Sequence, residues 1–428
     1  MPSRFSLVSR RFLADSRFLS SSFALFLAVR ISLILLVPVT PSSDAAWYLS
    51  RAATIASDGT YSENRIPTAY WPVGYPAVLG LLFLWTGPSL LVAQVANLLF
   101  GAMTFWLLYL WTLRTFGDHL VARGAALLLT VYPNNIAYAP LVLTEYLYTA
   151  LLLLVSVLLL RPHSNARLAT AGFVFGLGTL VKTQTLLLVP ALVVIACCSA
   201  WSLRGVVATT LKAMIAVVVT LLVLVPWTVR NYLELGAFVP VSTNGGMALL
   251  AGNNPSVVGD YWRDYNDSNP LFEGVRFSVA DQVEANRRAG GIARQWILDN
   301  PTQFLALVPK KVFRLWAPDG EAEWQYQAGT PWYDQFALWF RLIRVLNQVF
   351  FTVILILCLL ALRRLLRSAA PPYMWFGMGV AALFTAISII FSGQSRYHFP
   401  AMPFLLAYAA WVVFTPRQRH PAENGSAS

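Results

Sequence analysis

Long apolar runs recur from one end of this 428-residue chain to the other, and they limit what it can fold into. Hydrophobic residues make up 57% of the sequence and charged residues 12%, whereas a soluble domain carries roughly a quarter charged residues. A helix needs about 20 apolar residues to cross a bilayer. The sequence therefore predicts an all-α polytopic membrane protein and not a soluble core with one anchor.

Ten runs are predicted to span the membrane. They lie near residues 18–40, 89–112, 121–139, 144–160, 167–181, 183–201, 206–228, 335–362, 373–391 and 397–415. A further apolar segment, YPAVLGLLFLWTG from Tyr75, is too short to span and is interpreted as an interfacial or re-entrant helix. The basic N-terminus precedes a long run without a small-residue cleavage site, so an uncleaved first span is expected.

The basic residues indicate the topology. With the N-terminus inside, the cytoplasmic segments hold Arg4, Arg10, Arg11, Arg17, Arg114, Arg123, Arg161, Arg167, Arg204, Lys212, Arg363, Arg364, Arg367, Arg417 and Arg419. The short outer connections YPNNIAYAPL and KTQT are nearly free of positive charge. This bias predicts both termini in the cytoplasm of a protein in the cytoplasmic (inner) membrane. It also explains the formal charge of +12 without nucleic acid as a partner.

Four regions are expected along the chain. Residues 1–228 form an N-terminal membrane domain of about seven spans, with a first outer loop at 41–75. Residues 229–332 form a small, mostly helical outer-face subdomain, because they combine the turn signals NGG, GNNP and DSNP with an amphipathic stretch that ends at Asn300-Pro301. Residues 333–415 hold the remaining spans, and residues 416–428 are a polar, disordered cytoplasmic tail.

Two acids at the predicted outer ends of spans are candidates for a site, because ionisable groups at membrane depth are costly and usually paired or functional. Asp44 follows the first span in PSSDAAWYLSRA, and Glu145 begins the fourth in LTEYLYTALLLL. Each acid also suits a helix N-terminus, where it would act as a cap or favour the helix dipole. The residues alone leave both interpretations open.

Three cations are predicted on the same side. Arg230 and its neighbour Asn231 follow the seventh span, Arg396 precedes the last, and Lys182 lies between the fifth and sixth. Outer-face arginines run against the positive-inside trend, although Arg230 also suits an interface anchor beside Trp227. Cations bind a phosphate, and a carboxylate can accept the proton of a hydroxyl. The set therefore suits a sugar carried on a lipid phosphate, and the spans would provide a hydrophobic groove for the lipid chain.

The three cysteines, Cys197, Cys198 and Cys358, lie inside apolar runs and match no metal spacing, so they are interpreted as small packing residues. No Walker motif and no dinucleotide-binding glycine motif is present. These residues therefore give no motif for a metal or a nucleotide.

Five motifs follow one another along nearly the whole chain. They are DAAWYLSRAATIASDGTY, YWPVGYPAVLG, LTEYLYTALLLL, PWTVRNYLELGAFVPVSTNGGMALLAGNNP and SRYHFPAMPFLLAYAA. In this order they resemble the GT-C class of polytopic glycosyltransferases, and within it the bacterial relatives of protein O-mannosyltransferases and of the lipid A aminoarabinose transferase. Each motif is weak alone, but five in order on one face form a strong signal.

The resemblance implies inverting transfer of a sugar from a polyprenyl-phosphate donor at the outer face. It makes Asp44 the catalytic base and Glu145 a second acid that orients the acceptor or the first-loop helix. It assigns the donor phosphate to Arg230, Arg396 and Lys182, so that no metal or other cofactor is demanded. The residues expected to line the site are Tyr48, Tyr75, Asn231 and Tyr397.

Three positions depart from the pattern of these relatives. Gln394 stands where many have an acid, Lys182 stands near where many have an arginine, and Ala45 follows Asp44 where relatives with protein acceptors often have an Asp-Glu pair. The sequence therefore does not identify the acceptor, which can be a protein, a lipid or a cell-wall glycan.

Two other functions compete with transfer. A transporter or flippase of lipid-linked sugars would also need a greasy groove and cations, but transporters usually place repeats and broken helices at the bilayer midplane. A structural membrane scaffold explains the spans but not the outer-face Arg230 and Arg396. The sequence favours the transferase, followed by the transporter.

Overall fold

The computed structural model describes residues 17–160, 164–197, 202–257, 275 and 279–415, and these are mostly helical. The helices of the first half are α2 (Phe18–Leu36), α3 (Asp44–Asp58), α4 (Gly74–Thr86), α5 (Leu90–Phe116), α6 (His119–Val131), α7 (Pro133–Ala137), α8 (Glu145–Leu159), α9 (Asn165–Val181), α10 (Thr185–Cys197) and α11 (Leu203–Leu235). The α-helices that follow are α12 (Gly245–Gly252), α13 (Gln282–Asp299), α14 (Pro301–Trp316), α15 (Glu323–Gly329), α16 (Ala337–Arg367), α17 (Phe376–Ile390) and α18 (Met402–Phe414). Short 3-10 helices are η2 (Asp334–Phe336), η3 (Pro372–Trp375), η4 (Ser395–Tyr397) and η5 (Phe399–Ala401).

Every predicted span coincides with a helix, which identifies a multi-pass membrane protein. In the described part of the chain, six helices are long and apolar enough to cross a bilayer: α2, α5, α11, α16 with η2, α17 with η3, and α18 with η4 and η5. The predicted spans at 121–139, 144–160, 167–181 and 183–201 correspond to the shorter helices α6, α8, α9 and α10. The number of ten spans therefore stays a prediction, and the segment from Tyr75 is the 13-residue helix α4.

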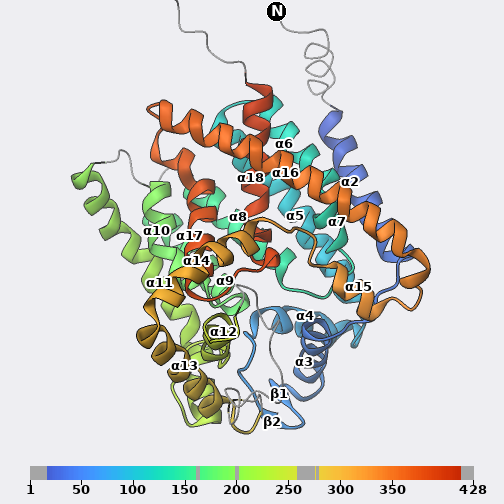
Figure 1. The fold of residues 1–428 in the computed structure, drawn as a ribbon, viewed down its shortest axis with the longest axis vertical. Coiled ribbons are helices and arrows are strands. Elements are labelled where there is room, and N and C mark those ends of the chain that lie inside the picture. The colour runs from blue at the N-terminus through green and yellow to red at the C-terminus, as the bar shows by residue number, and fades with distance from the viewer. Residues whose placement is uncertain (1–16, 161–163, 198–201, 258–274, 276–278, 416–428) are drawn as a thin grey trace, which may run out of the picture.

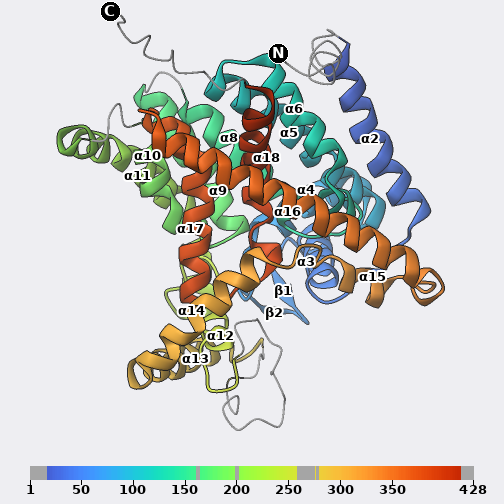
Figure 2. The same cartoon turned by 45° about the horizontal axis from the view of Figure 1, so that its top comes forward.

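The helices form a bundle with loops gathered at one end. The start of α2 and the end of α18 lie at the top in Figure 1, and Figure 2 shows the same placement. Helix α3 and the helices α12 and α13 lie at the opposite end. Helix α18 is enclosed by α5, α6 and α16, and its apolar residues are nearly all buried. The start of α2 and the end of α18 thus lie at one end of the bundle, and the cytoplasmic location of both termini stays a prediction.

A hairpin that the sequence did not predict closes the first loop. Strands β1 (Ser62–Glu63) and β2 (Ile66–Pro67) pair antiparallel. Asn64 and Arg65 connect them with φ angles of 50° and 65°, which is the left-handed backbone that two-residue hairpin turns require.

The region 229–332 is helical where it is described. Helix α13 ends at Asp299 and α14 begins at Pro301, so the helix end predicted at Asn300-Pro301 is confirmed. Met247, Leu250, Val275, Ala289 and Ala293 form a small apolar cluster apart from the main core. The DSNP turn, Cys198 and the tail 416–428 lie outside the described residues, and so do the predicted topology residues Arg4, Arg10, Arg11, Arg161, Arg417 and Arg419.

One buried cation fixes the first span against its neighbours. Arg30, in the middle of α2, has no exposed surface. It donates to the carbonyls of Leu129 (3.1 Å) and Thr130 (3.3 Å) at the C-terminal end of α6. It also donates to Asn135 Oδ1 (2.5 Å) and to the Tyr146 hydroxyl (3.3 Å). The negative end of a helix dipole and these oxygens together satisfy a charge that would otherwise be costly inside a membrane.

We predict that Arg30→Met lowers the stability of the purified protein in detergent, because each buried acceptor left without a donor costs about 1–3 kcal/mol. Arg30→Lys keeps the charge but offers fewer directed donors, so its loss should be intermediate. Thermal unfolding of the three proteins in one detergent measures this. An Arg30→Met protein that melts with the wild type would contradict the prediction.

Candidate functional site

Four charged side chains from distant parts of the sequence meet in one row. Arg396 Nη1 lies 2.8 Å from Asp44 Oδ2, and Arg396 Nε lies 3.1 Å from Glu145 Oε1. Lys182 Nζ lies 3.1 Å from the same Glu145 oxygen. The charges therefore alternate as acid, base, acid, base. Glu145 is fully buried, and the other three side chains are 13–17% exposed.

Helix ends bring these four residues together. Asp44 is the first residue of α3, Glu145 is the first of α8, and Lys182 directly follows α9. Arg396 lies in η4, before α18. Helix ends are where the chain can carry a charge without breaking an apolar helix, and the first turn of α3 and of α8 favours an acid.

The described contacts show what Asp44 does in this state. Its carboxylate pairs with the Arg396 guanidinium. Ser43, the residue before the helix, has φ 49° and its side chain makes no cap bond. Asp44 is thus oriented toward the basic partner by an unusual backbone turn, because a non-glycine residue rarely adopts this φ.

Two glycines permit the close approaches that the row requires. A Cβ on Gly74, at the start of α4, would lie 2.7 Å from the carbonyl of Leu180, two residues before Lys182. A Cβ on Gly393 would lie 1.9 Å from the carbonyl oxygen of Lys311 in α14. Both contacts are with backbone, which cannot move aside as a flexible side chain can. The first loop and the η4 segment therefore pack against their neighbours only with glycine there.

Aromatic residues line one side of the row. The Tyr48 ring packs edge-on against Tyr75, with centroids 5.6 Å apart, and the Tyr75 hydroxyl donates to Asn97. Burial raises the pKa of Tyr48 well above its usual range, and the nearby Asp44 carboxylate raises it further. Tyr48 therefore stays neutral and shapes the site. Tyr397 lies within electrostatic range of Arg396 and Asp44.

The structure does not bring Arg230 and Asn231 into the row. The Arg230 guanidinium donates to the carbonyls of Tyr61 (2.6 Å) and Thr68 (2.8 Å), one on each side of the β1–β2 hairpin. Asn231 is buried and donates to the Val239 carbonyl. Arg230 therefore braces the first loop, whereas Asn231 fixes the segment that follows α11. The phosphate contact assigned to Arg230 stays a prediction.

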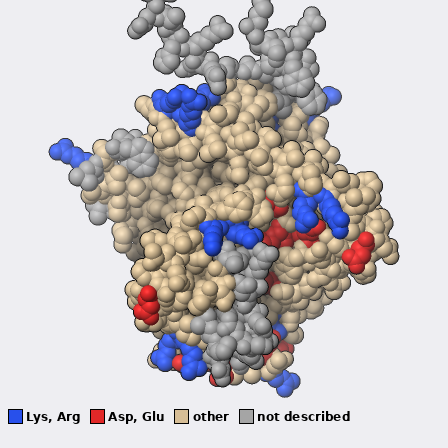
Figure 3. Space-filling view, viewed as in Figure 1, with Lys and Arg blue, Asp and Glu red and all other residues tan. Residues whose placement is uncertain are grey.

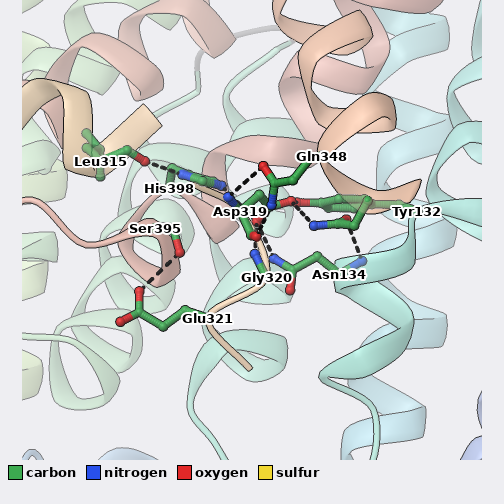
Figure 4. A network of polar contacts seen from close by, with 10 residues as sticks. Tyr132, Asn134, Leu315, Asp319, Gly320, Glu321, Gln348, Ser395 and His398 are labelled. Atoms are coloured by element: carbon green, nitrogen blue, oxygen red, sulfur yellow. Dashed lines mark hydrogen bonds and ion pairs between the residues drawn. The ribbon is translucent and has the colours of Figure 1, made fainter. Parts of the chain in front are cut away.

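A second polar network, which the sequence analysis missed, lies beyond η4 (Figure 4). Asp319, in the connection between α14 and α15, is buried and accepts from Tyr132 Oη (2.8 Å), Asn134 Nδ2 (2.5 Å) and Asn347 Nδ2 (3.1 Å). His398 places Nε2 at 3.3 Å from Asp319 Oδ1. This one carboxylate joins the α6–α7 turn, α16 and the segment after Arg396.

The loop 317–322 contacts residues before and after Arg396. Asp319 contacts His398, and Glu321 accepts from Gln394 Nε2 (2.7 Å) and Ser395 Oγ (3.0 Å). Figure 4 shows the contact of Glu321 with Ser395 and that of Asp319 with His398. The Glu321 carboxylate lies against Gln394. The sequence carried no clear signal for this network, because Asp319 and Glu321 lie among other polar residues such as Glu323 and Gln325.

Within the residues that the structure describes, no group of three or more histidine, cysteine or acidic side chains is arranged to hold a metal ion. Asp44 and Glu145 are each paired with a cation.

Known proteins resemble this chain at two levels. Residues 71–229 match the model of the family described as dolichyl-phosphate-mannose-protein mannosyltransferase. None of the curated proteins matches the sequence.

Solved structures share the fold at low identity. The Archaeoglobus fulgidus oligosaccharyltransferase AglB, in complex with an inhibitory peptide and a dolichol-phosphate, has a TM-score of 0.55 at 13% identity, over 92% of this chain and 50% of that one. The Archaeoglobus fulgidus oligosaccharyltransferase complex with Zn and sulfate has a TM-score of 0.52 at 15% identity, over 91% of this chain and 48% of that one. ArnT from Cupriavidus metallidurans bound to undecaprenyl phosphate has a TM-score of 0.44 at 16% identity, over 94% and 77%.

This chain thus spans about half the length of the archaeal enzymes whose fold it shares. The family match over residues 71–229 and the shared archaeal fold agree with the resemblance to the GT-C class that the motifs predicted.

We predict that Glu145→Gln destabilises the protein more than Lys182→Met does. The first change leaves two cations without their shared anion, and breaking a buried pair in this way costs about 3–5 kcal/mol. The second change leaves Glu145 paired with Arg396. Thermal unfolding of both single variants and the double variant gives the coupling, which should be about 0.5–3 kcal/mol. Additive losses would show that the pair does not interact.

We also predict that Asp319→Asn lowers both stability and turnover. The amide nitrogen would face groups that are themselves donors, and each unpaired buried donor costs about 1–3 kcal/mol. Asp334→Asn, an exposed change at the start of η2, is the matched control and should be neutral. Unfolding temperatures of both variants in one detergent test this, and equal temperatures would refute it.

Proposed function

We propose that this protein is an inverting glycosyltransferase that moves a sugar from a polyprenyl-phosphate donor to a hydroxyl acceptor at the outer face of the cytoplasmic membrane. The observation that carries the proposal is the row Asp44–Arg396–Glu145–Lys182. It supplies a partly exposed carboxylate beside two cations, at helix ends. A base and a phosphate site are therefore adjacent.

The comparisons support a lipid-phosphate donor. The matching family is described by a dolichyl-phosphate sugar, and the archaeal enzyme that shares the fold binds a dolichol-phosphate. Those enzymes use protein or peptide partners by their names, but this chain spans only half of the archaeal one. The acceptor class is therefore argued separately below.

The reaction follows from the ion pairs. A phosphate that binds beside Arg396 would replace Asp44 as the partner of its guanidinium, because guanidinium groups bind phosphate and carboxylate in the same geometry. Asp44, thus released, would take the proton of the acceptor hydroxyl. The hydroxyl oxygen forms a bond to the anomeric carbon as the carbon–oxygen bond to the phosphate breaks. Arg396 and Lys182 stabilise the charge on the departing polyprenyl phosphate.

Glu145 has a supporting part in this scheme. It is buried and contacts both cations, so it holds Arg396 and Lys182 side by side without itself reaching the surface. Two cations this close would repel each other without the shared anion. We assign Glu145 the orientation of the phosphate-binding groups, and Tyr48, Tyr75 and Tyr397 the walls of the site.

The test is Asp44→Asn in membranes of a deletion strain, at expression matched to the wild type. Loss of a general base should lower the transfer rate by a factor of about 10²–10⁴. The polyprenyl-phosphate sugar should accumulate and one envelope glycoconjugate should disappear. Both are measured by mass spectrometry of lipid and glycan extracts.

Asp58→Asn is the matched control, since Asp58 is the exposed last residue of the same helix α3. It should leave both levels unchanged. If Asp44→Asn also leaves them unchanged, Asp44 is not the base, and a transporter of lipid-linked sugars becomes the better explanation.

A further inference from the structure

A second cavity lies on the other side of the segment that carries Arg396. It has a volume of about 780 Å³ and lies between the end of α14, the loop 317–322, α15, the first turns of α16 and residues 393–395. Lysine, arginine, aspartate and glutamate side chains gather near the middle of the face in Figure 3, over the region between α14 and α15. None of the residues assigned to catalysis lines this cavity.

The cavity and the proposed site share a wall. Gln394 and Ser395 line the cavity, and Arg396, the next residue, pairs with Asp44 and Glu145. Glu321 also lines the cavity and holds Gln394 and Ser395 in place. A ligand in the cavity would therefore lie next to the segment that carries Arg396.

The lining has the chemistry of a carbohydrate site. Glu323 and Arg344 line the cavity and form a 2.8 Å ion pair, in which the Arg344 side chain is 53% exposed and the Glu323 carboxylate also accepts from the Tyr333 hydroxyl. Gln327 and Gln394 add amides. Carboxylate, guanidinium and amide groups are planar and bind neighbouring hydroxyls in pairs.

Trp324 supplies an apolar platform. Its side chain is partly exposed and lines the cavity. Among the residues that the structure describes, its indole makes no ring contact and no hydrogen bond. An aromatic face next to convergent polar groups is what binds a ring with one apolar side and a hydroxyl rim.

Other acceptor classes fit this lining less well. A lipid acyl chain needs a continuous apolar groove, and the cavity instead presents three carboxylates, two guanidinium groups and several amides. A peptide acceptor usually pairs its backbone with a strand edge or fills apolar side-chain pockets. The described lining comes from helices and loops and has no strand.

We propose that this cavity binds the acceptor and that the acceptor is a hydroxyl-rich carbohydrate, stacked on Trp324 and bonded by Glu323, Arg344 and Gln327. The inference rests on the proposed transferase function, because only then does the ligand need a hydroxyl at Asp44.

Saturation-transfer NMR on the purified full chain in detergent tests the proposal, with maltotetraose, cellotetraose and chitotetraose as probes. The wild type should transfer saturation to at least one probe. Trp324→Ala should weaken that binding at least tenfold, whereas Trp85→Ala, which removes a 90% exposed tryptophan at the end of α4, should not. If Trp324→Ala unfolds on purification, Gln327→Ala at an exposed position replaces it and should weaken binding as well.

Absence of transfer to all three probes, or equal binding by the wild type and the cavity variants, would overturn the proposal. Asp44→Asn separates this result from the reaction, because Asp44 does not line the cavity and its variant should bind the probes normally. Probe binding with no effect of Asp44→Asn on donor turnover would sink the transferase and leave a carbohydrate-binding cavity. Donor turnover lost in Asp44→Asn without any probe binding would sink only the carbohydrate acceptor.

Discussion

The pairing of buried charge organises this molecule. An ionised side chain taken out of water must find a partner, and at the edge of a membrane few partners are available. Arg396 is shared between Asp44 and Glu145, and Glu145 is shared between Arg396 and Lys182. These contacts tie residues 44, 145, 182 and 396 together, so the first loop, two helix ends and the segment before α18 cannot be placed independently.

The need to pair a buried charge recurs at Arg30 and at Asp319. Arg30 is satisfied by the carbonyl end of α6 and by Asn135, and Asp319 by donors from the α6–α7 turn and α16. Asn134 and Asn135 are neighbours in α7, yet Asn134 contacts Asp319 and Asn135 contacts Arg30. The short helix α7 therefore transmits the position of the first span to the loop that grips Arg396. A site built on helix ends in this way is held by rigid elements and not by the loops alone.

The sequence could predict much of the site but not its supports. Asp44, Glu145, Lys182 and Arg396 were identifiable because an acid or base beside an apolar run has few structural explanations. Arg230 looked equivalent by the same criterion, yet its guanidinium is taken by two carbonyls of the β1–β2 hairpin. That hairpin depends on left-handed angles at Asn64 and Arg65, which carry no glycine signal. Likewise Arg30 was assigned to an apolar run and Asp319 to a loop, because Leu129 and Asn135 lie 99 and 105 residues from Arg30, and Tyr132 and Asn134 lie 187 and 185 residues from Asp319. Long-range pairing of single polar groups leaves no periodic trace in the sequence.

In the proposed mechanism, the balance of charge explains why Asp44, the base, lies next to the cations that bind the phosphate. The row is neutral as two acids and two cations, and a bound phosphodiester adds one negative charge. During the proposed transfer, a proton moves from the acceptor to Asp44 while the departing phosphate gains one negative charge. The negative charge therefore shifts from Asp44 toward Arg396 and Lys182, whose N–H groups are already positioned to stabilise it. Glu145 stays paired throughout, so little must reorganise except the partner of Arg396. In the proposed mechanism, Asp44 is released from Arg396 only when the sugar donor is bound, which ties proton removal to a filled donor site and disfavours the use of the base on water alone.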